Sequence, residues 1–236
     1  MKAILLAGGY GTRISEETDV KPKPMVLIGE KPIIWHVMNI YAQHGFTDFV
    51  IAGGYKFEVI DEWVARTDFS NWNVSAIDTG LETQTGGRIA QCMKHIGHER
   101  VFVTYGDGVG NIPIKKVLRH HELRNKLATV TAVRPPARFG VIETEAGEVT
   151  HFGEKDHTNA GWINGGFFIL EPQVADYINN NSEPFEKFAL PRLVGAKQLT
   201  AYEHEGFWQP MDTLREKNLL ESMVSEKTPP WLQFLD

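Results

Sequence analysis

Short apolar segments alternate with segments of helical periodicity over the first 133 residues, and this alternation restricts the possible folds more than any other feature of the chain. The apolar segments are continuous and bounded by glycine, as buried parallel strands are. The intervening segments repeat apolar side chains every three or four residues. We predict strands at 2–8, 48–55, 73–79, 100–108 and 127–133, and helices at 31–45, 57–66, 86–97 and 112–125. This order predicts an α/β fold, a doubly wound, mixed but mostly parallel Rossmann-like sheet that binds ligands at the carboxyl ends of its strands.

The strand–helix alternation ends after residue 133. A hairpin is expected over 139–155, because Ala146-Gly147 separates two strand-like runs. A glycine-containing strand at 162–172 follows, then helical stretches between 172 and 195, a strand at 198–208 and a closing helix over 213–225. We therefore divide the chain into a core, 1–133, and a smaller α+β part, 134–236, packed with the core as one domain.

Composition excludes several classes of function. The net charge is −6 and no basic face dominates, which argues against nucleic-acid and anionic-membrane partners. No apolar run approaches the ~18 residues of a membrane span, and the first run is too short for a secretory leader, so we expect a cytoplasmic protein. A single cysteine, Cys92, forms no disulfide framework and has helical spacing that predicts inert packing. The nine histidines show no metal-binding spacing.

A glycine-rich turn, "GGYGTR" at 8–13, follows the first predicted strand. Glycines allow a backbone to approach a ligand closely, and the amides of such a turn can hold a polyphosphate. The spacing fits neither the P-loop nor the dinucleotide pattern, so a purely structural turn is the alternative. Lys21 and Lys23 follow in "VKPKPM", held extended by the next proline. With Arg13 they would neutralise a triphosphate, unless they are ordinary solvated lysines.

These segments also resemble a known family. "LAGGYGTRI" followed by "KPKPMV" is similar to sugar-1-phosphate nucleotidylyltransferases, and the resemblance extends over about residues 1–231. It is strongest to the members that join CTP and glucose 1-phosphate. The region 57–77 departs from them, because the family usually carries a longer insertion there. Further matching segments are "DTGLETQTGGRI", "VFVTYGDGV", "TVTAVRPPARFG", "FGEK", "GWINGGFFIL" and "GFWQPMDTLREK".

The resemblance implies roles for residues of the core. Arg13 and Lys23 would be catalytic, and Asp107 and Asp212 would hold Mg²⁺, which favours one or two carboxylates plus substrate phosphates. From the residues alone, Asp107 could instead cap a turn, and Asp212 or Thr85 could cap a helix. The nucleotide-binding set would be Leu6, Ala7, Gly8, Gly9, Gly11, Thr12, Arg13, Thr85, Gly86, Gly87, Arg88, Gly106 and Asp107. In it, Gly86 and Gly87 would let a flat base lie on the backbone, and Thr85 and Arg88 would bond to the base or the phosphates.

The second part of the chain would bind the sugar phosphate. Lys155 suits a phosphate as a compact point charge, and Glu154 and Asn164 suit sugar hydroxyls. Glu154-Lys155 could also be a surface pair at the end of the hairpin. Gly140 would let the sugar ring approach the backbone, and Trp162 would offer an apolar wall or be an ordinary core residue.

The implied reaction joins CTP and a sugar 1-phosphate, expected to be α-D-glucose 1-phosphate, to give a CDP-sugar and pyrophosphate, with Mg²⁺ as cofactor and a homo-oligomer as the expected assembly. Alternatives are the same reaction with UTP, dTTP or GTP or another acceptor phosphate, and a nucleotide-binding regulator without turnover. A glycosyltransferase is disfavoured, because "GDGV" supplies one acid where closely spaced acids are expected.

Overall fold

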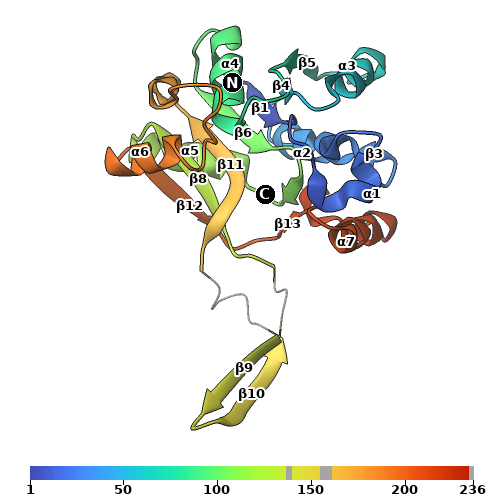
Figure 1. The fold of residues 1–236 in the computed structure, drawn as a ribbon, viewed down its shortest axis with the longest axis vertical. Coiled ribbons are helices and arrows are strands. Elements are labelled where there is room, and N and C mark those ends of the chain that lie inside the picture. Colours follow the sequence, from blue (N-terminus) through green and yellow to red (C-terminus); the bar gives the residue numbers. More distant parts are fainter. Residues whose placement is uncertain (137–139, 155–160, 234–236) are drawn as a thin grey trace.

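The structure is a computed structural model that describes residues 1–136, 140–154 and 161–233. A seven-stranded sheet lies at its centre, in the order β12-β8-β11-β6-β1-β4-β5 (Figure 1). β11 runs antiparallel to both of its neighbours, and the other adjacent strands pair in parallel. The strands are β1 (Ala3–Leu6), β4 (Asp48–Gly53), β5 (Asn73–Asp78), β6 (Val101–Tyr105), β8 (Ala128–Val133), β11 (Ile163–Leu170) and β12 (Leu199–His204). The predicted mixed, mostly parallel sheet is confirmed.

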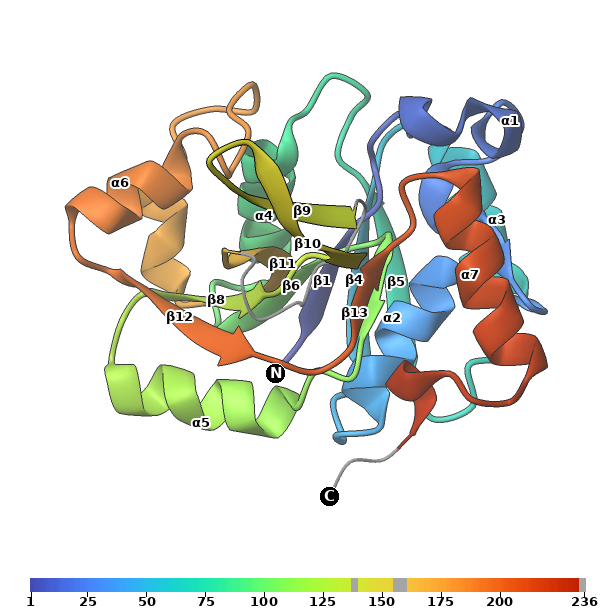
Figure 2. The same cartoon turned by 90° about the horizontal axis from the view of Figure 1, so that it is seen from below.

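Helices cover both faces of this sheet, because successive side chains of a strand point to opposite faces. Leu5 of β1 belongs to the apolar core under α2, α3, α5 and α7, whereas Ile4 and Leu6 belong to the core under α4 and α6. Figure 2 shows α2 and α5 on the opposite side of the sheet from α4 and α6. The helices are α1 (Ser15–Thr18), α2 (Ile33–Ala42), α3 (Phe57–Arg66), α4 (Thr85–Ile96), α5 (Ile114–Arg124), α6 (Ala189–Gly195) and α7 (Leu214–Ser225).

Most predicted elements outside the core are also present. The hairpin consists of β9 (Gly140–Glu145) and β10 (Glu148–Glu154), and Ala146 and Gly147 turn it with φ of 49° and 89°. The helical stretch between 172 and 195 is a 3-10 helix, Pro172–Tyr177, followed by α6. Further 3-10 helices are Thr12–Ile14, Lys23–Met25 and Pro230–Leu232. No described helix combines the length and the apolar character that crossing a membrane requires.

Two small sheets were not predicted. β2 (Leu27–Ile28) pairs with β3 (Lys31–Pro32), and β7 (Gly108–Gly110) pairs antiparallel with β13 (Trp208–Pro210). The second pair matters for function, because it joins the segment after β6 to the segment before α7. Cys92 lies on α4 and packs in the apolar core, as expected. Burial there raises the pKa of its thiol to about 12.

Candidate active site

The glycine turn after β1 is packed on one side and open on the other. A Cβ on Gly8 would lie 2.1 Å from Cζ of Arg88, so a larger residue there would displace the Arg88 guanidinium. A Cβ on Gly9 would meet nothing within 4 Å, and Gly11 has a φ of +66° that disfavours other residues. The glycines therefore serve close packing behind the turn and leave its front accessible.

Arg88 holds this turn from behind. Its side chain is 4% exposed, and burial lowers the pKa of the guanidinium. Nη2 donates to the carbonyl oxygen of Gly8 at 3.0 Å, while Nη1 donates to the carbonyl oxygen of Gly53 at 2.6 Å. Further donations reach Thr79, Gly80 and Leu81. The sequence predicted that Arg88 would bond to a base or phosphate, but here its donors are directed at protein oxygens and hold three loops together.

The start of α4 is covered by the segment 181–186. The Thr85 hydroxyl donates to Oε2 of Glu186 at 2.8 Å and accepts from the amide of residue 185 at 2.8 Å. A Cβ on Gly86 would lie 2.6 Å from the carbonyl oxygen of Glu183, and one on Gly87 would lie 2.5 Å from the backbone of residue 181. Protein backbone thus occupies the space that a Cβ at either position would need. This packing alone is a sufficient reason for glycine at both positions.

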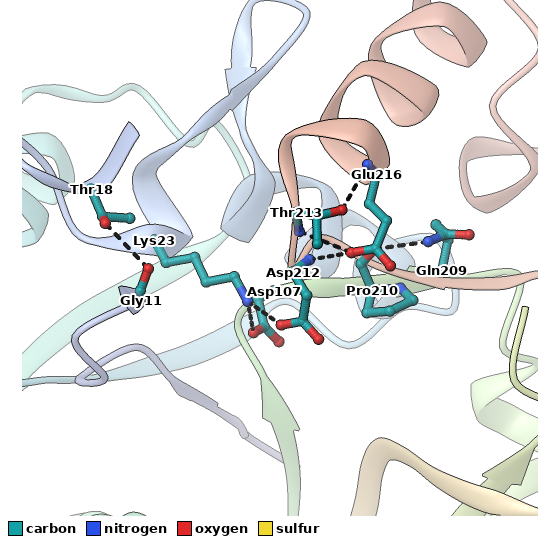
Figure 3. Close-up of polar contacts among 9 residues, drawn as sticks. All are labelled: Gly11, Thr18, Lys23, Asp107, Gln209, Pro210, Asp212, Thr213 and Glu216. Carbon is teal, nitrogen blue, oxygen red and sulfur yellow. Dashed lines mark hydrogen bonds and ion pairs between the residues drawn. The ribbon is translucent and has the colours of Figure 1, made fainter. Parts of the chain in front are cut away.

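Lys23 brings the two predicted metal ligands together. Its Nζ lies 2.6 Å from Oδ2 of Asp107 and 2.7 Å from Oδ1 of Asp212 (Figure 3). The Lys23 side chain is 10% exposed. Burial alone would lower its pKa, but the two carboxylates outweigh burial, so the pKa is raised above its ordinary value. The expectation that Lys23 lies on an extended segment is wrong, because Lys23 begins a 3-10 helix, Lys23–Met25, and only Pro22 before it is extended, with ψ of 151°.

Asp107 and Asp212 meet because β7 and β13 pair. Gly108 lies opposite Pro210 in this pair, and the amide of residue 211 donates to the carbonyl oxygen of Asp107 at 2.8 Å. Thr213, not Asp212, is the N-cap of α7, where it forms a capping box with Glu216. The carboxylate of Asp212 is therefore directed at Lys23 instead of at the helix (Figure 3).

Two cavities meet at this group of charges. The larger, of about 350 Å³, is lined by the glycine turn, Lys23 and the start of α4, and the smaller, of about 210 Å³, lies toward β11 and Trp208. Tyr105, Asp107 and Asp212 line both cavities. The larger cavity includes the predicted residues Leu6, Ala7, Gly8, Gly9, Gly11, Thr12, Thr85, Arg88, Gly106 and Asp107.

The predicted sugar-phosphate residues have different positions. Asn164 lines the smaller cavity. Trp162 stacks under the guanidinium of Arg134, whose Cζ lies 3.8 Å from the centre of a ring. Gly140 and Glu154 pair at the base of the hairpin. Lys155, as well as the side chains of Arg13 and Glu154, lies outside the described part of the chain.

Sequence reasoning did not single out Tyr105 and Trp208, which line the cavities, or Glu186, which accepts a hydrogen bond from Tyr105. Tyr105 is the last residue of β6, and that position at the carboxyl end of a predicted strand could have identified it. Trp208 lies in a three-residue strand and Glu186 in a loop, so neither follows a periodic pattern.

Comparison with known proteins identifies the family of this chain. The model of the nucleotidyl transferase family matches residues 2–222 of the 236. The chain belongs to the nucleotidyl transferase family. A glucose-1-phosphate cytidylyltransferase of Salmonella typhi is 45% identical to this nucleotidyl transferase, with 98% of each chain covered. The resemblance inferred from the sequence is therefore confirmed.

Proteins with lower identity to this nucleotidyl transferase have names that refer to other nucleotides or sugars. A mannose-1-phosphate guanyltransferase of Yarrowia lipolytica is 32% identical over 97% of this chain and 66% of that protein. The crystal structure of HddC from Yersinia pseudotuberculosis complexed with GMP-PN has a TM-score of 0.76 at 23% identity, covering 94% of this chain and 99% of that one. At that identity the likeness concerns the fold, and it agrees with the Rossmann-like sheet described above.

Proposed function

We propose that this nucleotidyl transferase joins CTP and α-D-glucose 1-phosphate to give CDP-glucose and pyrophosphate. The observation that carries the proposal is the group formed by Lys23, Asp107 and Asp212 at the junction of two cavities. The larger cavity has the size and the bare glycine turn that a nucleoside triphosphate needs, and the smaller one suits a sugar phosphate. The choice of CTP and glucose rests on the relative at 45% identity.

In this reaction an oxygen of the sugar phosphate attacks the α-phosphorus of CTP. The bond from that phosphorus to its bridging oxygen breaks, and the electron pair leaves with pyrophosphate. The attacking oxygen is already anionic near neutral pH, so no protein base is required. The main obstacle is the repulsion between two anionic substrates, which positioned cations overcome. We assign this role to Lys23 and Arg13.

Asp107 and Asp212 suit Mg²⁺. Both carboxylates reach one ammonium group, so they are close enough to share one cation. Two carboxylates combined with phosphate oxygens form a donor set that Mg²⁺ accepts. A bound Mg²⁺ would stabilise charge on the reacting phosphates as a Lewis acid. Lys23 lies at the same point and would exchange a carboxylate for a phosphate oxygen.

The two parts of the chain would divide the substrates between them. Residues 1–133 would bind the nucleotide, and 134–236 would bind the sugar phosphate, with Lys155 and Glu154 among the residues expected to contact it. Asn164 supports this division because it lines the smaller cavity. From the family resemblance we further propose that the protein acts as a cytoplasmic homo-oligomer supplying nucleotide sugar for polysaccharide biosynthesis.

A screen of nucleotides against acceptors tests the proposal. The protein is incubated with Mg²⁺, each of CTP, UTP, dTTP and GTP, and each of several sugar 1-phosphates, and pyrophosphate release is measured. CTP with glucose 1-phosphate should give the largest kcat/KM. A larger value for another pair would replace the assigned substrates, and nucleotide binding without pyrophosphate release for any pair would indicate a regulator.

A further inference from the structure

Glu186 connects the walls of the two cavities. It lies between the 3-10 helix Pro172–Tyr177 and α6, in a segment with no periodic pattern. Its Oε2 accepts a hydrogen bond from the hydroxyl of Thr85 at 2.8 Å, on the side of the larger cavity. Its Oε1 accepts one from the hydroxyl of Tyr105 at 2.5 Å, and Tyr105 lines both cavities.

The direction of the next hydrogen bond follows from the bond to Glu186. A phenol has a single O–H, and Tyr105 donates it to Glu186, so its oxygen can only accept from another group. Nδ2 of Asn164 lies 3.0 Å away and is the donor. A tyrosine phenol is protonated near neutral pH, so this donation to Glu186 is maintained.

Asn164 is consequently held in one orientation. Its Nδ2 faces Tyr105, and its Oδ1 accepts from the amide of Gly166 at 2.8 Å. Gly166 has a φ of +79°, and a Cβ there would lie 2.4 Å from the ring of Tyr105, so this turn packs directly on that ring. The remaining donor and acceptor of the Asn164 amide are then available to the smaller cavity, which Asn164 lines.

We propose that Glu186 is a positioning residue that fixes the Asn164 amide for the acceptor sugar phosphate through Tyr105. The inference rests on the proposed function, since it takes the smaller cavity as the acceptor site. Without Glu186, the Tyr105 hydroxyl loses the acceptor that directs its proton away from Asn164, and the bond from the Gly166 amide would orient the Asn164 side chain alone. The amide that the cavity presents to the acceptor would then be positioned less firmly.

The test compares substitutions that differ in what they remove. Glu186→Ala removes both hydrogen bonds and should raise the KM for the acceptor about three- to tenfold, the range expected for one lost hydrogen bond. The nucleotide KM should change less than about twofold, because Thr85 keeps its hydrogen bond from the amide of residue 185 and Glu186 makes no described hydrogen bond to Lys23 or the glycine turn. Glu186→Gln keeps a carbonyl oxygen that can accept from Tyr105, so it should restore most of the wild-type acceptor KM.

Tyr105→Phe provides a second test of the proposal, because it removes the hydroxyl through which Glu186 acts. It should raise the acceptor KM by itself, and adding Glu186→Ala to it should produce no further rise. Glu183→Gln is the matched control on the same segment. It disturbs the ion pair with Arg192, at 2.6 Å, and the side chain makes no described contact with Tyr105 or Thr85. This control should leave the acceptor KM unchanged.

The measurements use the nucleotide and sugar phosphate pair that the wild-type protein turns over fastest, and calorimetric binding of the sugar phosphate supplies a readout without turnover. A different best pair would refute the proposed substrates and still test Glu186. An acceptor KM and affinity unaltered in Glu186→Ala would overturn the inference. So would equal increases in both KM values, or the same effect in Glu183→Gln.

Discussion

Replacing Lys23 by alanine should affect catalysis and stability in ways that can be separated. The ammonium neutralises two carboxylates, 2.6 and 2.7 Å away. Loss of a positioned charge that stabilises a transition state typically costs ~2.7–4 kcal/mol, so Lys23→Ala should lower kcat about 10²- to 10³-fold. Breaking a buried pair costs ~3–5 kcal/mol of stability, but Asp107 is 33% exposed and Asp212 19% exposed. Solvent screening therefore reduces the expected loss to about 1–2 kcal/mol.

The pH dependence of this loss is diagnostic. Two carboxylates without their counter-ion bind a proton more tightly in the folded than in the unfolded protein, so the stability of Lys23→Ala should rise as the pH falls from 8 to 5. In the wild type the pKa of Lys23 is raised, and its contribution is fully present below the ordinary value of 10.5 and lost only as the pH rises above it. Between pH 5 and 8 this group should therefore leave the wild-type stability flat.

Thermal unfolding with and without Mg²⁺, at pH 5 and pH 8, is the assay, alongside pyrophosphate release. Mg²⁺ should raise the Tm of Lys23→Ala more than that of the wild type, because the ion replaces the missing charge. Adding Asp212→Asn should restore stability to Lys23→Ala but not activity. Near wild-type turnover in Lys23→Ala, or a Tm deficit that neither pH nor Asp212→Asn relieves, would refute the electrostatic reasoning.

Three further predictions concern the surroundings of the site. Gly86→Ala places a Cβ 2.6 Å from the carbonyl oxygen of Glu183, so urea unfolding should show a loss of about 1–3 kcal/mol; unchanged stability would mean that segment 181–186 yields easily. Thr213→Ala removes the capping box of α7 and should cost ~0.5–2 kcal/mol in the same assay, while Thr213→Ser should retain most of it. Cys92, buried and with its pKa raised to about 12, should not react with a thiol reagent in the native protein at pH 8 and should react after unfolding.

Local patterns predicted the parts of the fold that depend on local sequence. The helix predicted at 57–66 has the same bounds in the structure. Its apolar spacing involves only residues a few positions apart, so the sequence contains that information locally. The Lys-Pro argument failed for Lys23, which begins a 3-10 helix although a proline follows it, because that preference of the residue before proline is a tendency that tertiary contacts can override. The family resemblance, and not the spacing, suggested pairing Asp107 with Asp212.

What the sequence did not predict depends on distant partners. The three-residue strands β7 and β13 are too short to show a period, so their pairing could not be recognised. Arg88 follows a glycine pair that is typical of a ligand-binding turn, yet its partners lie in loops that only the folded sheet brings near. Glu186 stands in "PFEKF", where nothing distinguishes it from a surface acid until Thr85 and Tyr105 are seen beside it.

The pairing of β7 with β13 also has a consequence for how the protein is made. During synthesis the amino-terminal elements leave the ribosome first and can begin to fold before the rest is translated. Asp107 emerges early, but its partner strand and Asp212 belong to the last stretch of the chain. A nascent chain therefore acquires its two-carboxylate cation site only after residue 212 has left the ribosome. Ribosome-bound chains that stop before residue 208 should accordingly be inactive, even though most of the sheet is already present.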